Sequence, residues 1–273
     1  MNKPFTVACI QNCATNDTNT SMAECIDLCK SAKDKGATFI FTPEFCGHLY
    51  VEGKNFSTDP KPENQHSALH SFQALATELD IWLCIGSLAV ADPDGNLRNR
   101  SFVINSHGAI VSRYDKIHMF DVTLSDGEIY RESDTFTPGE QAVIATTPFS
   151  EIGLSICYDL RFASLYRLLA QNGATILTVP AAFTHTTGKA HWHVLLRSRA
   201  IETGCFVIAA CQYGYHGSAH TYGHSLIIDP WGKILAEGGE EQDIIIADID
   251  LQHVNNARSR IPALIHDRPI KLS

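Results

Sequence analysis

Hydrophobic and polar positions alternate with two different periods along most of the chain. Phe5–Gln11 and Thr38–Thr42 are short apolar runs, as is typical of buried strands. Between them, apolar residues recur at helical spacing from Met22 to Ala32, and Gly36 can end that helix. Strands this apolar, separated by helices, predict a layered α/β fold in which helices cover the sheets.

The rest of the chain continues this alternation. We expect further helices at 66–79, 163–172 and 189–203, and further strands at 81–88, 100–105, 109–114, 142–147, 151–157, 175–180, 206–211, 222–228, 233–236 and 243–249. Residues 47–64 are expected to form a loop, and 116–140 a long connection of the kind that tends to be functional. Because no linker or break in composition divides the chain, we expect one domain over residues 1–273.

Composition and charge narrow the class of protein. The 273 residues are 44% hydrophobic and 19% charged, which excludes a disordered or repetitive chain. The net charge is −9 without a basic stripe, so neither nucleic acid nor a membrane surface is expected as a partner. The apolar run Phe5–Ile10 is shorter than the core of a signal peptide. The nine cysteines are scattered, with no Cys-x-x-Cys pair, so we expect reduced thiols in a cytoplasmic protein.

The segment GLSICYDLRF (153–162) predicts a nucleophile at Cys157. A strand is expected to end at Cys157, a polar turn follows, and a helix is expected to begin near Ala163. This order places a side chain at the carboxyl end of a sheet beside free backbone N–H groups. A helix N-terminus also favours the thiolate. The alternative is that Cys157 is one more apolar core thiol, like the other eight cysteines.

Two polar residues follow other predicted strands. Glu44 comes after the apolar run 38–43 and could exchange protons with a thiol, whereas a solvated or helix-capping acid is the simpler interpretation. Lys116 follows the strand at 109–114 and could stabilise an oxyanion, whereas a surface lysine is the simpler interpretation. Because Glu44, Lys116 and Cys157 each follow a strand, we expect them to converge on one edge of a sheet.

Six motifs occur in order along almost the whole chain. They are PEF (43–45), YDKIHMFD (114–121), GLSICYDLRF (153–162), TVPAAFTHTTGKAHWHVLLRSRAIET (178–203), YGHSLIIDPWG (222–232) and RIP (260–262). Their order and spacing resemble the nitrilase superfamily of carbon–nitrogen hydrolases. Within it, DVTLSDGEIYRESDTFTPGE (121–140) and TTGKAHW (186–192) resemble the subgroup that contains deaminated glutathione amidase and ω-amidase.

This resemblance implies a four-layer α-β-β-α sandwich, a catalytic triad of Glu44, Lys116 and Cys157, and a second active-site acid at Glu132. The implied reaction is hydrolysis of a small ω-amide through a Cys157 thioester with release of ammonia, without a metal or cofactor. The favoured substrate is deaminated glutathione, and the alternative is 2-oxoglutaramate or 2-oxosuccinamate. A nitrilase and a non-catalytic binding protein of the same fold are the less favoured hypotheses.

Further residues near the triad are expected to contact the reacting groups or the substrate. They are Tyr158, through its backbone N–H, and Arg161, Phe183 and Thr184. Arg161 could bind an anionic end of the substrate, or it could form a structural ion pair with Asp159. Trp192 could add an apolar wall, with core packing as an equal alternative.

The chain departs from the family pattern at two places. Ala163-Ser164 stands where Pro-Glu is common, and His193 where Glu is common after AHW. A metal hydrolase is a rival hypothesis, since His216, His220 and His224 are spaced i, i+4, i+8, but glycines interrupt this stretch and no HExxH pattern accompanies it. A thiol-redox protein is another, disfavoured because no second cysteine is near Cys157 in sequence.

The resemblance also implies a homodimer. The helices expected around 162–172 and 190–203 would pair with those of a second copy. The C-terminal segment, about 254–273, would cross onto the partner subunit.

Overall fold

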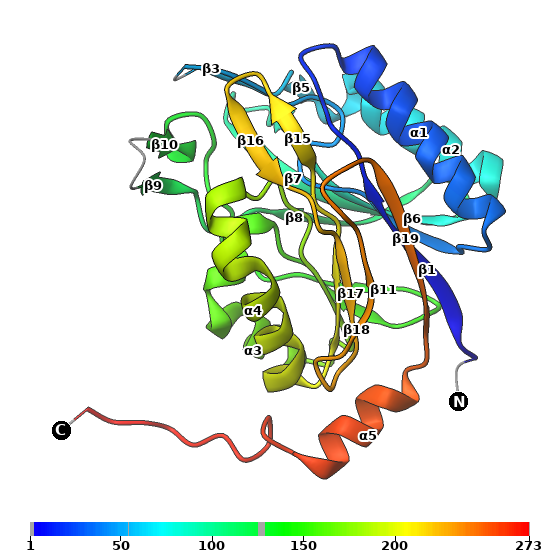
Figure 1. Ribbon diagram of the computed structural model, residues 1–273, viewed down its shortest axis with the longest axis vertical. Helices are drawn as coiled ribbons and strands as arrows, with labels where there is room; N and C mark the ends of the chain where they lie inside the picture. The colour runs from blue at the N-terminus through cyan, green and yellow to red at the C-terminus, as the bar shows by residue number, and fades with distance from the viewer. Residues whose placement is uncertain (1–2, 54, 125–128, 273) are drawn as a thin grey trace.

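Two β-sheets lie between two pairs of helices (Figure 1). The computed structural model describes residues 3–53, 55–124 and 129–272. Residues 125–128, which belong to the predicted long connection, lie outside the described residues. The helices α1 (Thr18–Asp34) and α2 (Ser67–Leu79) flank one sheet, and α3 (Ala163–Gln171) and α4 (His185–Thr203) flank the other. The predicted α-β-β-α order of layers is therefore present.

The first sheet is built from the N-terminal half of the chain and one late strand. Its strands are β1 (Phe5–Gln11), β2 (Phe39–Phe41), β5 (Lys61–Pro62), β6 (Trp82–Ala91), β7 (Leu97–Ile104), β8 (Ile110–Asp115) and β19 (Asp243–Ile249). Their order is β19-β1-β2-β6-β7-β8, with β5 beside β6. The strands β1, β2 and β6 run parallel, so their carboxyl ends meet at one edge of the sheet.

The second sheet is built from the C-terminal half. Its strands are β11 (Ile144–Thr146), β12 (Glu151–Gly153), β13 (Ile176–Thr178), β14 (Phe206–Ala209), β17 (Leu226–Ile228) and β18 (Ile234–Glu237), in this order across the sheet. The central strands β12, β13 and β14 run parallel. Their connections pass through α3 and α4, which explains the strand–helix alternation of the sequence.

Burial on both faces explains why the strands are so apolar. In β2, Phe39 and Phe41 point into the core between the two sheets, where they meet residues such as Ile176 and Val207 of the second sheet. Ile40, between them, points to the other face and packs with α2 residues such as Phe72. Successive side chains of a strand alternate between its two faces. In a strand covered on both faces, every side chain is therefore buried, and apolar residues are favoured at every position.

Most predicted elements are confirmed, and several differ in detail. The predicted long connection at 116–140 contains β9 (Asp121–Thr123), which pairs antiparallel with β10 (Ile129–Arg131). The predicted loop at 47–64 contains a hairpin of β3 (Tyr50–Glu52) and β4 (Asn55–Ser57). Helix α4 begins at His185, before the predicted residue 189. The predicted strand at 222–228 divides into β16 (Ala219–Tyr222), which pairs with β15 (Tyr213–His216), and β17.

A further difference is that the strand expected to end at Cys157 ends at Gly153. Beyond Gly153, the Ser155 hydroxyl donates a hydrogen bond to the backbone oxygen of Thr178 at 2.6 Å. A side chain thus occupies an acceptor that a strand ladder would use, and the chain turns out of the sheet.

The chain ends in α5 (Gln252–Arg260) and an extended tail, which reaches away from the two sheets (Figure 1). The side chains of Ile265, Ile270 and Leu272 in this tail are exposed. Within the described ranges, no helix combines the length and the apolar character needed to cross a membrane.

Candidate active site

The turn that carries Glu44 is held in place by β6. The backbone N–H of Gly86 donates to the Thr42 hydroxyl at 3.1 Å, and that of Phe45 donates to the Ser87 hydroxyl at 3.0 Å. Phe45 adopts a positive φ of 52°, which a non-glycine residue rarely does. These contacts fix the backbone on both sides of Glu44, so its side chain leaves the edge of the first sheet in a defined direction.

Lys116 lies directly after β8 and is buried between two carboxylates. Its Nζ is 2.9 Å from Oε1 of Glu44 and 2.8 Å from Oε2 of Glu132, and the exposed fractions of the three side chains are 2%, 4% and 8%. Glu132 lies at the start of a 3₁₀ turn, η2 (Glu132–Asp134), within the predicted long connection. Two acids from distant parts of the chain therefore share one ammonium.

Neutral donors complete the hydrogen bonding of the two acids. Nδ2 of Asn99 donates to Oε1 of Glu44 at 2.9 Å and to Oε1 of Glu132 at 3.1 Å. The backbone N–H of Ala182 donates to the other oxygen of Glu44 at 2.8 Å, and that of Phe120 donates to Glu132 at 2.7 Å. No sequence pattern marks Asn99, which lies within β7 and directly precedes the strand predicted at 100–105.

Cys157 opens a short 3₁₀ turn, η3 (Cys157–Arg161), with a positive φ of 48°. Its backbone N–H donates to the Pro180 oxygen at 2.8 Å. The fully buried carboxylate of Asp159 accepts from the Ile156 N–H at 2.8 Å, from the Tyr114 hydroxyl at 2.7 Å and from the His118 ring at 2.7 Å. This strained turn, like the nucleophile turns of other hydrolases, is therefore anchored to both halves of the fold.

The electrostatics favour an ammonium and a neutral thiol at rest. Burial alone would lower the pKa of Lys116, but the charges of Glu132 and Glu44 raise it well above its usual value. Burial raises the pKa of Cys157, and the negative charge of Glu44 raises it further, against the opposing effect of Lys116. The helix N-terminus predicts a thiolate, but burial beside the Glu44 carboxylate favours the neutral thiol of Cys157 at rest.

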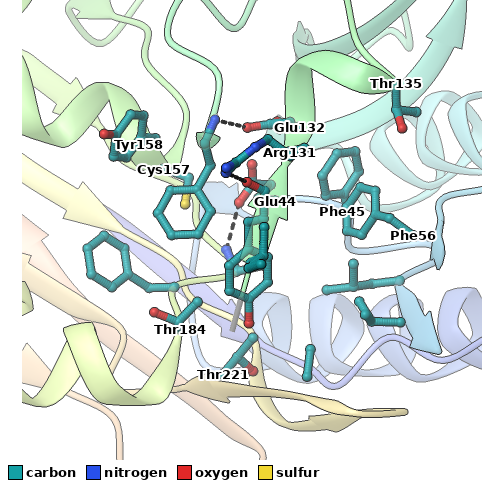
Figure 2. Close-up of a pocket in the computed structure, with 18 of the residues that line it drawn as sticks. Glu44, Phe45, Phe56, Arg131, Glu132, Thr135, Cys157, Tyr158, Thr184 and Thr221 are labelled. Carbon is teal, nitrogen blue, oxygen red and sulfur yellow. Dashed lines mark hydrogen bonds between the residues drawn. The ribbon is translucent and has the colours of Figure 1, made fainter. Parts of the chain in front are cut away.

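These side chains lie at one side of a cavity of about 570 Å³ (Figure 2). The reactive groups of Glu44, Lys116, Glu132 and Cys157 line it together with Tyr158. An apolar wall is formed by Phe45, Leu49, Val51 and Phe56. Further polar groups come from Arg131, Thr184, Thr187, Ser218 and Thr221. In the view of Figure 2, Cys157 and Tyr158 lie across the pocket from Phe45 and Phe56. A long apolar wall facing a few convergent polar groups is typical of a small-molecule site.

The remaining predicted residues are divided between the pocket and its surroundings. Tyr158, Phe183 and Thr184 line the cavity, whereas Arg161 is not among the lining residues. The Arg161 guanidinium instead lies over the rings of Tyr158 and Phe183, at 5.9 and 5.8 Å from their centroids. The Asp159 carboxylate, which was the alternative partner predicted for Arg161, instead accepts hydrogen bonds from Ile156, Tyr114 and His118. Trp192 is fully buried and packs against Phe183 from the core side.

The three histidines at i, i+4, i+8 spacing are not brought together. Nδ1 of His216 lies 2.6 Å from the Ala14 oxygen, and the His220 ring stacks on Tyr215. His224 instead lies beside Glu237, 3.3 Å from its carboxylate. A spacing of four residues would align these histidines only on a helix, whereas this segment forms the β15–β16 hairpin and a turn.

Comparison with known proteins agrees with this geometry. The family model for carbon–nitrogen hydrolases matches residues 6–259. The chain is 35% identical over 271 residues to a deaminated glutathione amidase of Yersinia enterocolitica, and the match covers 97% of this chain and 94% of that protein. The chain belongs to the carbon–nitrogen hydrolase family.

Solved structures resemble this carbon–nitrogen hydrolase over nearly its whole length. The NitFhit protein of C. elegans has a TM-score of 0.88 and 32% identity, and the match covers 97% of this chain but only 65% of that longer one. Nit3 of Saccharomyces cerevisiae, a member of branch 10 of the nitrilase superfamily, has a TM-score of 0.86 and 29% identity, with 96% of both chains covered. These matches confirm the predicted nitrilase fold and superfamily. They also confirm that the protein is an enzyme that hydrolyses the carbon–nitrogen bonds of amides.

The close contact between β6 and the Glu44 turn yields a test of stability. A methyl group added at Gly86 would collide with the backbone oxygens of Thr42 and Pro43. We expect Gly86→Ala to lower the free energy of unfolding by about 1–3 kcal/mol, measured by urea denaturation. Gly239→Ala is the matched control, since a methyl group there meets no atom within 4 Å. Equal stability of the two variants would contradict this packing.

The thiol electrostatics yield a second test, by alkylation of Cys157 with iodoacetamide as a function of pH. Because the Glu44 charge raises the pKa of Cys157, Glu44→Gln should let the thiolate form at lower pH. We expect the midpoint of alkylation to fall by about one pH unit. Glu140→Gln, at an exposed acid, should leave the midpoint unchanged. An unchanged or higher midpoint in Glu44→Gln would show that Glu44 does not act on the thiol.

Proposed function

We propose that the protein is an amidase that cleaves deaminated glutathione through a thioester on Cys157. The observation that carries the proposal is the buried ammonium of Lys116, held by Glu44 and Glu132 in the wall that also contains Cys157. A nucleophile, a proton acceptor and a fixed positive charge are the groups that acyl transfer from an amide requires.

The first half of the proposed reaction forms the thioester. Glu44 takes the proton of the Cys157 thiol as the sulfur attacks the amide carbon, and the carbonyl oxygen becomes an oxyanion. The Lys116 ammonium and the Tyr158 backbone N–H stabilise that oxyanion, with about 3–4 kcal/mol for each well-placed donor. Glu44 then gives its proton to the nitrogen, the carbon–nitrogen bond breaks, and the amine leaves.

The second half releases the acid. Glu44 takes a proton from water as the water oxygen attacks the thioester carbon, again through an oxyanion. The carbon–sulfur bond breaks, the sulfur recovers the proton, and the carboxylic acid departs. Glu132 acts by position, because its two oxygens, 2.9 and 2.8 Å from Nζ, keep Lys116 aimed at the reacting carbonyl.

The size and lining of the pocket support a peptide-like substrate. A cavity of about 570 Å³ has room well beyond a primary amide, and Phe45 and Phe56 offer an apolar wall to a longer tail. Arg131 and Thr221 offer cationic and hydroxyl groups to anionic ends. Since glutathione is a tripeptide, cleavage of its deaminated form releases a peptide amine. The release of ammonia expected from the sequence applies only to primary amides such as 2-oxoglutaramate, the substrate of the alternative ω-amidase.

The test is a panel of substrates with detection of both the acid and the amine products. We expect deaminated glutathione to have the highest kcat/KM, ahead of 2-oxoglutaramate, 2-oxosuccinamate, glutamine and a simple nitrile. Cys157→Ala should reduce turnover at least about 10³-fold, since the nucleophile is lost. Mass spectrometry of the trapped enzyme should show the acyl group on Cys157. Activity retained in Cys157→Ala would contradict the thioester, and a preference for 2-oxoglutaramate would select the alternative.

We further propose a single catalytic domain that forms a homodimer through α3 and α4. Of the segment predicted to cross onto the partner, about 254–273, we propose this for the tail beyond α5, because Val254 of α5 is buried in the core of its own chain; Ser273 lies outside the described residues. The outer faces of these helices carry exposed apolar side chains, among them Leu168, Val194 and Ile201, and Trp231 lies exposed nearby. A cytoplasmic location is proposed from the nine free cysteines, eight of which are buried.

Charge substitutions on α4 test the dimer. Val194 and Ile201 are 64% and 56% exposed, and a buried unpaired charge at either position would oppose association. We therefore expect Val194→Glu combined with Ile201→Glu to sediment as a monomer, whereas the unmodified protein sediments as a dimer. Val111→Glu on β8 is the control, because Val111 is also exposed but lies on the other sheet. A monomeric unmodified protein would refute this interface.

A further inference from the structure

Two histidines and a carboxylate from three different elements meet outside the pocket. His193 lies on α4, His224 lies between β16 and β17, and Glu237 ends β18. Nε2 of His193 is 2.8 Å from Oε1 of Glu237, and Nδ1 of His224 is 3.3 Å from the same oxygen. One potential ligand atom from each residue lies within 4.8 Å of the other two.

We propose that His193, His224 and Glu237 form a binding site for a divalent transition-metal ion of the Zn²⁺ class. Imidazole nitrogens and a carboxylate oxygen are ligands that Zn²⁺ prefers, at about 2.0–2.2 Å. Ligand atoms around one such ion lie about 3–4 Å from one another, so small side-chain rotations suffice to admit it. Three protein ligands leave a fourth position for water. This proposal does not rest on the proposed amidase function.

The backbone around His224 is fixed before any ion binds. The His224 N–H donates to the Gly239 oxygen at 2.9 Å, and its carbonyl oxygen accepts from Nε1 of Trp192 at 2.7 Å. His224 also adopts a positive φ of 50°. A non-glycine residue held in this conformation by bonds on both sides aims its ring in a set direction, as a metal ligand must be aimed.

An additional acid, the exposed Glu240, lies near enough to His224 for a small side-chain rotation to make a supporting hydrogen bond. When Nδ1 of His224 binds the ion, Nε2 carries the proton, and this nitrogen is 3.8 Å from Oε1 of Glu240. A carboxylate behind a ligating histidine fixes its tautomer and strengthens the metal bond.

The location gives the site a structural role. An ion held by His193 and Glu237 would join the middle of α4 to the end of β18. Trp192, next to His193, packs against the pocket residue Phe183 with 4.9 Å between ring centroids. Binding would therefore stabilise the helix whose N-cap residue Thr184 and first-turn residue Thr187 line the pocket.

The experiment uses the full chain carrying Cys157→Ala, which removes the pocket thiol as a competing ligand. Calorimetric titration with ZnCl₂ should show one ion bound per chain, and CoCl₂ should give visible absorption bands without a thiolate charge-transfer band. His193→Gln and Glu237→Gln should each weaken binding at least about 100-fold, and Glu240→Gln about 10–100-fold. His107→Gln, at an exposed turn histidine, should bind Zn²⁺ unchanged.

Thermal unfolding supplies an independent readout. Zn²⁺ should raise the unfolding midpoint of the Cys157→Ala chain and of its His107→Gln variant, but not that of its His193→Gln variant. His193→Glu, which restores a ligating group, should recover binding relative to His193→Gln. If the chain binds no Zn²⁺, or if His193→Gln and Glu237→Gln bind it as tightly as His107→Gln does, the proposal is wrong.

Discussion

The arrangement of the pocket depends on one buried ammonium shared by two carboxylates. A lysine taken out of water is stable as a cation only where anions and hydrogen bonds replace the lost hydration. Glu44 and Glu132 supply those anions to Lys116, and they come from opposite sides of it in the sequence. The same ion pairs therefore bring the end of β2, the end of β8 and the turn η2 to one place.

Two negative charges around one positive charge leave a net negative charge, which hydrogen-bond donors around the two carboxylates must stabilise. Asn99 and the backbone N–H groups of Ala182 and Phe120 do this without adding a further charge. The Ala182 N–H belongs to the second half of the chain, so the orientation of Glu44 depends on the packing of both sheets. Burial raises the pKa of Cys157 and the charge of Glu44 raises it further, which explains why the thiol keeps its proton until a base takes it.

One close approach of backbone to backbone and one buried side-chain hydrogen bond hold this geometry. Gly86 admits the Glu44 turn because no side chain stands between β6 and Pro43. The η3 turn is joined to the first sheet through the Tyr114 hydroxyl, which donates to the buried carboxylate of Asp159. The nucleophile from one sheet and the acids from the other are thereby held at a fixed separation, which a reaction that passes protons between them requires.

The periodicity of the sequence was sufficient to predict apolar sheets covered by helices, because burial of a strand or a helix face leaves a local pattern of apolar residues. The four-layer order came from the resemblance to a known family. Glu44 and Lys116 follow strands of one sheet and meet as expected. The expectation that Cys157 shares the same sheet edge was wrong, because Cys157 follows a strand of the second sheet. The role of Glu132 came only from the resemblance to a known family, since nothing local distinguishes an acid in a long connection.

Other features were decided by the tertiary structure alone. The role of Asn99 and the exclusion of Arg161 from the pocket lining depend on distances between residues far apart in the chain, and local patterns do not encode such distances. The histidines of the 216–224 segment were separated because a hairpin replaced the helix that their spacing would need. The protonation state of Cys157 also depends on the tertiary structure, because burial and neighbouring charges set its pKa and both exist only once the two sheets have packed.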